Sequence, residues 1–249
     1  CITTLGCIAD DFTGASDAAS FLKAAGFGPI LFNGIPKKAD WHRFKADALV
    51  IALKTRTMPK EKAVEQILEA AGWLKEQGVK QFYFKYCSTF DSTPEGNIGP
   101  CADALMKFCG AAYTILCPAL PVNRRQVTAG HLYVDGKPLH ESAMKDHPLT
   151  PMWDSYIPAL MKGQSTYPCH ILTKTALDDR KEFARQMERW KEESSFFYLV
   201  PDYETEEEIS RLIERKKKYI RLGYGFGRTD FMAKEVLKPF FETYRDVQV

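Results

Sequence analysis

The sequence lacks the features that mark several large classes of protein. No apolar run in the 249 residues approaches the length of a membrane span, roughly 18 residues, and no signal peptide is visible. Lys and Arg total 34 and Asp and Glu total 32, a net charge of +2. This nearly even balance indicates neither a nucleic-acid partner nor a membrane partner.

The cysteines and histidines argue against two further kinds of site. The 7 cysteines are odd in number and show no C-x-x-C spacing, and the 5 histidines show no metal-ligand spacing. We therefore expect reduced thiols in a cytoplasmic protein and no metal site on this chain.

What the sequence does contain is a regular alternation of apolar runs and amphipathic stretches. The apolar runs predict strands at 4–9, 29–33, 46–53, 81–86 and 113–117. Amphipathic periodicity predicts helices near 16–25, over 59–77 and over 98–108. Strands separated by helices predict an α/β fold: a mostly parallel, Rossmann-like sheet with helices on both faces.

The pattern changes after Pro118. Residues 131–139 predict an inserted β-hairpin with Asp135 and Gly136 at its turn. The α/β rhythm then returns, with strands at 170–173 and 196–200 and a helix over about 177–190. A last helix is predicted from Thr205, as its N-cap, to about Lys217.

Polar side chains gather where three of the predicted strands end. They are Asp10, Asp11, Lys54, Arg56, Lys85, Ser88, Thr89 and Asp91. Ligands of open α/β sheets bind beyond the carboxyl ends of the strands. Carboxylates there accept hydrogen bonds or a proton from a hydroxyl, and Arg56 and Lys85 suit a carboxylate. The combination favours a small hydroxylated anion such as a sugar acid.

Each cluster also has a purely structural interpretation. The segment 9–15 is equally a polar turn, with Thr13 or Ser16 capping the next helix. The segment 85–97 is equally a Ser/Thr-rich loop with Asn97 as a helix cap. For Lys54 and Arg56, the structural interpretation is that they are cations of an exposed loop.

A fourth polar group follows the strand at 113–117. Asn123 and Arg124 or Arg125 leave another strand end, where they would face the same crevice. His140 and His147 offer hydrogen-bonding groups, although a lone loop histidine is more often structural.

Four segments carry a family resemblance: ADDFTGASD (9–17), FKYCSTFDSTPEGNIGP (84–100), PALPVNRR (118–125) and GHLYVDGKPLHESAMKDHPLTPM (130–152). From about residue 4 to about 200 the chain resembles the N-terminal half of the four-carbon acid sugar kinases. The KYCSTFDST and LHESAMKDHPLTPM forms resemble the 3-oxo-tetronate kinase branch.

The resemblance implies a two-domain kinase that transfers the γ-phosphoryl group of ATP to the 4-hydroxyl of a 3-oxo-tetronate. It implies a sugar acid bound by the N-terminal domain, and ATP and Mg²⁺ bound by the C-terminal domain. Asp11 or Asp91 would accept the hydroxyl proton, and Arg56 and Lys85 would hold the carboxylate. Further implied substrate contacts are Asp10, Lys54, Ser88, Thr89, Asn123, Arg124 and Arg125.

The chain departs from the family pattern near its end. We expect residues 1–215 to form the sugar-acid-binding domain and 216–249 to be a remnant or the start of the nucleotide-binding domain. Residues 223–228 are Gly-rich but lack the preceding apolar strand that a phosphate loop needs. We therefore expect this chain alone to bind substrate without turnover.

Two alternatives remain beside the kinase. A non-catalytic sugar-acid-binding module, or a truncated kinase remnant, shares the same site residues. A phosphatase with a D-x-D-x-T motif does not fit, because the residue two before Asp11 is Ala9 and the residue two after Asp10 is Phe12. The sequence leaves the oligomeric state open, with a homo-oligomer possible.

Overall fold

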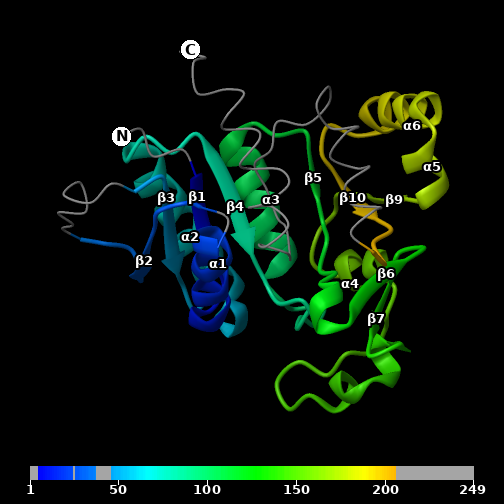
Figure 1. Ribbon diagram of the computed structural model, residues 1–249, viewed down its shortest axis with the longest axis horizontal. Helices are drawn as coiled ribbons and strands as arrows, with labels where there is room; N and C mark the ends of the chain where they lie inside the picture. Colours follow the sequence, from blue (N-terminus) through cyan, green and yellow to red (C-terminus); the bar gives the residue numbers. More distant parts are fainter. Residues whose placement is uncertain (1–4, 25, 38–45, 206–249) are drawn as a thin grey trace.

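In the computed structural model, which describes residues 5–24, 26–37 and 46–205, the parallel strands divide into two sheets (Figure 1). The predicted helix running to Lys217, the Gly-rich segment at 223–228 and the expected region 216–249 lie outside the described residues. No helix within the described ranges is both long enough and apolar enough to cross a membrane.

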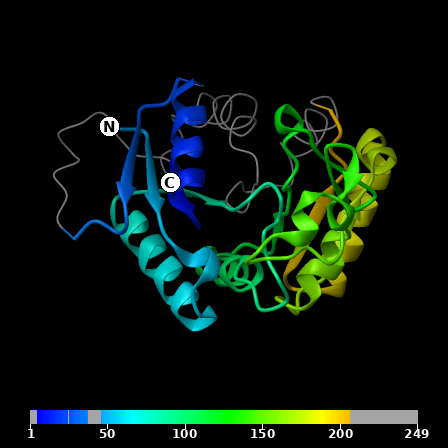
Figure 2. The same ribbon diagram turned by 90° about the horizontal axis from the view of Figure 1, so that it is seen from below.

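The first sheet has the order β2-β3-β1-β4, with every pair parallel. Its strands are β1 (Leu5–Ala9), β2 (Pro29–Asn33), β3 (Ala48–Ala52) and β4 (Gln81–Lys85). Its helices are α1 (Phe12–Ala24), α2 (Lys60–Glu76) and α3 (Ile98–Cys109). Strands β1, β3 and β4 are buried throughout, because α1 and α2 cover opposite faces of the sheet (Figure 2).

Helix α2 shows how the sequence pattern becomes packing. Its buried residues, Ala63, Ile67, Ala70, Ala71 and Leu74, recur at helical spacing. The helix follows Pro59 and ends before Gly78, whose φ of 84° is left-handed. The predicted helix over 59–77 is therefore confirmed to within a residue at each end.

The second sheet has the order β5-β10-β9, again parallel. Its strands are β5 (Tyr113–Ile115), β9 (Cys169–Leu172) and β10 (Phe197–Pro201), accompanied by α4 (Ile157–Lys162), α5 (Lys174–Asp178) and α6 (Arg180–Glu193). The helix predicted over about 177–190 is confirmed from Arg180 onward as α6, but its predicted start is wrong. Asp179 is non-helical (φ −101°, ψ 111°) and caps α6 by accepting from Lys181 N and Glu182 N.

A small antiparallel sheet, β6-β7-β8, is inserted between β5 and β9. It comprises β6 (Arg125–Thr128), β7 (His131–Val134) and β8 (Lys137–Pro138). The predicted hairpin turn is confirmed, because Asp135 (φ 52°) and Gly136 (φ 77°) are both left-handed, as a type I′ turn requires. Strand β6 was not predicted.

Helix α3 lies between the two parallel sheets (Figure 1). Its Asp103 accepts hydrogen bonds from Ser165 Oγ (2.8 Å) and from the hydroxyl of Tyr198 in β10. The predicted α/β class, with helices on both faces of a parallel sheet and an inserted hairpin, is confirmed. The division of the parallel strands between two sheets is the main feature that the sequence pattern did not predict.

Candidate functional site

Three strands of the first sheet end side by side and send their loops over one edge. Asp10 N donates to Lys85 O (3.0 Å), and Leu53 N donates to Ala9 O (2.9 Å). The loops after β1, β3 and β4 therefore begin next to one another, as expected for parallel strands.

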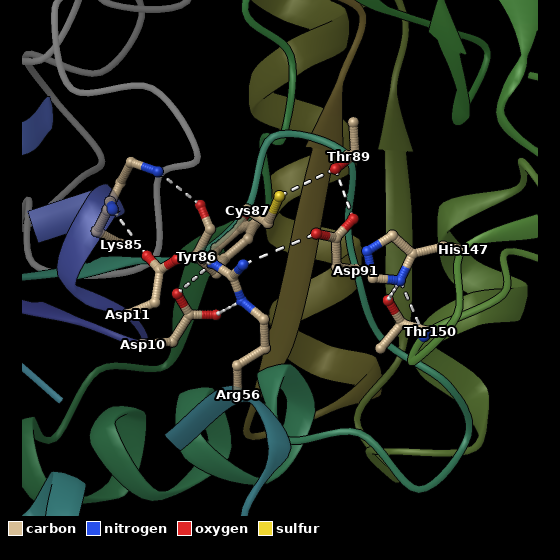
Figure 3. Close-up of polar contacts among 11 residues, drawn as sticks. Asp10, Asp11, Arg56, Lys85, Tyr86, Cys87, Thr89, Asp91, His147 and Thr150 are labelled. Carbon is tan, nitrogen blue, oxygen red and sulfur yellow. Dashed lines mark hydrogen bonds and ion pairs between the residues drawn. The ribbon is translucent and has the colours of Figure 1, made fainter. Parts of the chain in front are cut away.

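Arg56 lies at the centre of this edge, held by the short 3₁₀ helix Thr55–Thr57 that follows β3 (Figure 3). Its Nε and Nη2 donate to the two carboxylate oxygens of Asp10, at 3.0 and 2.8 Å. Its Nη2 also lies 3.3 Å from Asp11 Oδ2, and its Nη1 lies 3.7 Å from Asp91 Oδ2. One guanidinium therefore joins carboxylates from two different loops.

The Arg56–Asp10 pair is largely withdrawn from water, with 22% and 4% of the respective side chains exposed. Burial raises the pKa of Asp10, while the hydrogen bonds and charge of Arg56 oppose that rise. Burial lowers the pKa of Arg56, but the hydrogen bonds and charge of Asp10 outweigh it and leave that pKa raised. Arg56 is therefore a permanent cation within the cluster.

Asp11 has a structural task beside its contact with Arg56. Its Oδ1 accepts from Gly14 N at 2.7 Å, so Asp11 caps α1. Helix α1 begins at Phe12, earlier than the predicted start near Ser16, and the prediction of Thr13 or Ser16 as its cap is wrong. A Cβ atom on Gly14 would lie 2.7 Å from Asp11 Oδ1, so the cap needs glycine at that position.

Lys85 and Thr89 complete the polar edge. Lys85 is only 8% exposed, and its Nζ donates to Tyr86 O at 2.8 Å. Thr89 Oγ1 donates to Asp91 Oδ1 at 2.5 Å and lies 2.9 Å from Cys87 Sγ. Burial, and then the charge of Asp91, raise the pKa of Cys87, which keeps its thiol protonated. Asp91 is thus fixed through one oxygen, while its other oxygen faces Arg56.

A small depression opens beside Arg56. It is lined by Asp10, Thr55, Arg56, Phe84, Asp91, Ser92, Asn97 and Ile98. Asn97 Nδ2 donates to Thr55 O (2.6 Å) and Met58 O (2.7 Å), and Asn97 Oδ1 is buried with no partner among the described residues. Asn97 occupies the N-cap position of α3 but makes no side-chain capping bond.

Sequence reasoning missed Ser92 and Asn97 as site residues. Asn97 was considered only as a helix cap, and Ser92 was one hydroxyl among several in its loop. The polar composition of 88–97 was the available signal, but only folding reveals which of those side chains turn inward.

The remaining predicted residues have other surroundings than the Arg56 cluster, by which we mean Asp10, Asp11, Arg56 and Asp91. Lys54 is exposed and Ser88 half-buried. Asn123 ends the 3₁₀ helix Pro121–Asn123, Arg124 follows it, and Arg125 begins β6. Arg124 pairs with Asp135 (3.5 Å), and the Arg125 guanidinium donates to Asn123 O. Within the part of the chain that the structure describes, none of these five forms a hydrogen bond or ion pair with Asp10, Arg56 or Asp91.

The two loop histidines differ in their surroundings. His140 lies 3.7 Å from Glu141 and is partly exposed. His147 Nδ1 accepts from Thr150 N (3.0 Å) and lies 2.8 Å from Thr150 Oγ1. Figure 3 shows its ring turned toward Asp91, on the side away from Arg56.

The carboxylates do not form a metal centre. Across the described ranges, no three His, Cys, Asp or Glu side chains are arranged to hold a metal ion. Asp10, Asp11 and Asp91 instead surround a cation, Arg56. The arrangement suits a small polar anion that carries both hydroxyls and a carboxylate.

The fold and the site thus define an α/β protein with a polar cluster at the carboxyl edge of a parallel sheet, the edge at which ligands of such sheets bind. Residues 5–224 match the family of sugar-binding N-terminal domains, and the chain belongs to that family.

Curated relatives support the resemblance to the four-carbon acid sugar kinases. The chain is 43% identical to the 3-oxo-tetronate kinase of Brucella melitensis over 230 residues, which cover 92% of this chain and 52% of the relative. It is 46% identical to the 3-oxo-tetronate kinase of Escherichia coli over 205 residues, covering 82% and 52%. The chain thus spans about half the length of these relatives, and its resemblance to the 3-oxo-tetronate kinase branch is confirmed.

Solved structures confirm the fold. A putative tRNA synthase from Salmonella typhimurium superposes with a TM-score of 0.85 at 39% identity, covering 98% of this chain and 57% of that one. A domain of unknown function from Bordetella bronchiseptica, a domain-swapped dimer with bound citrate, superposes with a TM-score of 0.74 at 26% identity, covering 92% and 55%.

Proposed function

We propose that this chain is the sugar-acid-binding part of an ATP-dependent kinase that phosphorylates the 4-hydroxyl of a 3-oxo-tetronate. The observation that carries the proposal is the Arg56 cluster, in a chain whose relatives are 3-oxo-tetronate kinases. A non-catalytic sugar-acid-binding module, or a truncated kinase remnant, is the alternative.

Arg56 and Lys85 are the proposed partners of the substrate carboxylate. Two nitrogens of Arg56 are engaged by Asp10, which leaves Nη1 on the side of Asp91. Among the described residues, Lys85 Nζ donates to one carbonyl, that of Tyr86, and an ammonium group has three N–H donors. Both cations are therefore fixed and retain donors for a carboxylate.

Asp91 is the better candidate for the group that accepts the hydroxyl proton. One oxygen of Asp11 accepts from Gly14 N and caps α1, and the other lies 3.3 Å from Arg56 Nη2. Asp91 is oriented by Thr89 and has only a longer contact to Arg56 through Oδ2. A carboxylate held in place with one oxygen available suits a general base.

Asn97 and Ser92 supply hydrogen-bonding groups of the same depression. The amide orientation of Asn97 follows from its two carbonyl partners, so Oδ1 is the acceptor left over. A hydroxyl of the sugar acid would satisfy it, since a buried acceptor without a partner is destabilising.

The described residues do not fit Mg²⁺. Asp10 is committed to Arg56, and Asp11 is committed to Arg56 and the cap of α1. No group of three metal-ligating side chains is found in the described ranges. We assign both cofactors, ATP and Mg²⁺, to protein outside these residues, and we expect the 249-residue chain alone not to turn over.

The citrate-bound relative supports a small carboxylate ligand. Citrate, like a sugar acid, combines carboxylates with a hydroxyl, and that relative is also a dimer. A homo-oligomer and a cytoplasmic location remain predictions for this chain.

The proposal is tested by isothermal titration of the chain with 3-oxo-tetronate isomers and related C4 acids. Arg56→Ala and Lys85→Ala should each weaken binding by roughly 2–4 kcal/mol, and Asp91→Asn should lower kcat/KM of the complete kinase by a factor equivalent to roughly 2–4 kcal/mol. Arg185→Ala on α6 should change neither, because its only described ion pair is to Glu182 of the same helix. Failure of every C4 acid to bind would refute the proposal.

The kinase and the binding module differ in turnover. The product of the complete gene should phosphorylate a C4 acid when supplied with ATP and Mg²⁺. Binding without any phosphorylated product from that complete protein would favour the module.

A further inference from the structure

Gln164, just after α4, holds the loop that carries Asp91. Its Oε1 accepts from Gly99 N at 2.9 Å, and its Nε2 donates to Ser92 Oγ at 2.7 Å and to Thr93 O at 2.8 Å. The backbone N–H only donates and the backbone carbonyl only accepts, so the orientation of the Gln164 amide is fixed. Every one of these hydrogen bonds goes to the same loop and the start of α3.

The backbones on either side of these hydrogen bonds approach too closely for side chains. A Cβ atom on Gly99 would lie 2.6 Å from Gln164 Cβ and 2.9 Å from its backbone carbon. A Cβ atom on Gly163 would lie 2.8 Å from Pro94 Cβ. Glycine at both positions lets segment 163–164 dock directly against the loop, so the contact of Gln164 belongs to a closely fitted interface.

The loop that Gln164 holds forms one wall of the depression. Ser92, 2% exposed, and Asn97, 5% exposed, line it, and Asp91 precedes Ser92 directly. The hydrogen bonds of Gln164 lie at both ends of the segment between Asp91 and α3. Gln164 itself is not among the lining residues.

We propose that Gln164 is a positioning residue: it sets the placement of Asp91, Ser92 and Asn97 relative to Arg56 without touching the ligand. The importance of that placement for a hydroxylated acid rests on the proposed function. Because Gln164 follows α4, which lies beside the start of α3 (Figure 1), this residue makes the site depend on the second half of the molecule.

The neighbouring residue provides a matched control. Ser165 Oγ donates to Asp103 Oδ1, also on α3 (2.8 Å), but farther along the helix and away from the loop. Gln164→Ala and Ser165→Ala both remove a link between the same segment and α3. Only Gln164→Ala removes the bonds to Ser92, Thr93 and Gly99.

The first measurement needs no ligand. Amide hydrogen exchange of residues 92–99 should accelerate by about 10-fold or more in Gln164→Ala. The reason is that local opening of this segment no longer has to break the hydrogen bonds of Gln164. In Ser165→Ala the exchange of this segment should stay as in the parent protein. Unchanged exchange of 92–99 in Gln164→Ala would overturn the proposal whatever the ligand proves to be.

The second measurement is the affinity for the C4 acid that the parent protein binds best. Gln164→Ala should weaken it by roughly 10-fold, and Ser165→Ala by less than about 2-fold, at equal folded fraction. Equal affinity in Gln164→Ala despite a released loop would also overturn the proposal. If the parent protein binds no C4 acid, the proposed function fails, while the exchange measurement still decides whether Gln164 holds the loop.

Gly99→Ala tests the same contact from the other side. Its Cβ would displace Gln164, so it should reproduce both the faster exchange and the weaker binding. The double variant Gly99→Ala with Gln164→Ala should show less than the sum of the two effects, because both act on one contact. Fully additive effects would show that Gly99 and Gln164 act independently, which would contradict the assignment of Gln164.

Discussion

At the scale of single residues, Arg56 determines the electrostatics of the site. Three carboxylates lie within 4 Å of its guanidinium, and the most buried of them, Asp10, has little contact with water. Removing either partner of such a pair leaves the other charge buried without compensation.

Arg56→Ala should therefore destabilise the folded protein by roughly 3 kcal/mol, in addition to its effect on binding. Urea denaturation at neutral pH measures the change. Arg185→Ala, which breaks only an exposed pair with Glu182, should shift the free energy of unfolding by less than about 0.5 kcal/mol. A similar small shift for Arg56→Ala would contradict the described pairing with Asp10.

At the scale of elements, β1 and α2 pack closely because β1 contains a glycine. A Cβ atom on Gly6 would lie 2.8 Å from Val79 Cγ1 and 2.9 Å from Leu74 Cδ1. The strand that positions Asp10 and Asp11 is thus fitted to the end of α2 and the residues after it.

Gly6→Ala should destabilise the protein by about 1–3 kcal/mol, because the extra methyl group overpacks this contact. Gly72→Ala is the matched control: it lies within α2, and a Cβ atom there would meet nothing within 4 Å. That substitution should stabilise the protein by about 0.5–1 kcal/mol through helix propensity. Thermal unfolding of both variants checks the opposite signs, and a stabilising Gly6→Ala would show that the contact is looser than described.

The packing of β9 against α6 should make the stability of the folded protein depend on pH. His170 stacks on Trp190, with ring centroids 4.6 Å apart and planes at 8°, and its Nε2 is buried without a partner among the described residues. Burial lowers the pKa of His170; Glu193 raises it and Arg189 lowers it further. The unfolded chain therefore binds the proton more readily than the folded one.

The stability contributed by His170 should be complete above its ordinary pKa of about 6.5 and be lost as the pH falls below it. His170→Phe keeps a ring against Trp190 and removes the titration. The difference between the two proteins in the free energy of unfolding, followed from pH 7.5 to 5.0, should grow in favour of the variant as the pH falls. A difference independent of pH would exclude His170 as the titrating group.

At the scale of the whole molecule, α3 joins the two parallel sheets. Its first turn borders the depression, and its Asp103 accepts from Ser165 and from Tyr198 of the second sheet. Burial raises the pKa of Asp103, and the hydrogen bonds from Tyr198 and Ser165 oppose the rise.

Tyr198→Phe should destabilise the protein by about 1–3 kcal/mol, because a partly buried carboxylate loses a donor. Tyr113→Phe, on the neighbouring strand β5, is the control, since the hydroxyl of Tyr113 is buried with no partner in the described ranges. Removing that hydroxyl should be neutral or stabilising. Equal destabilisation by the two substitutions in a denaturant titration would argue against the link through Asp103.

The sequence by itself determined the elements and the polar ends of the first sheet. Apolar runs and helical spacing predicted β1 to β4 and α2, and parallel pairing placed Asp10, Asp11, Arg56, Lys85 and Asp91 at one edge. These features follow from periodicity and chain direction, which are local properties of the sequence.

Only the tertiary structure decided which strands pair and which side chains turn inward. It paired β5 with β10, it gave Arg124 a partner in Asp135 of the antiparallel sheet, and it made Asp11 the cap of α1. It also brought Gln164 against the Asp91 loop from 65 residues beyond Gly99. Contacts between distant segments depend on complementary shapes and hydrogen-bonding groups, and neither periodicity nor spacing along the chain records them.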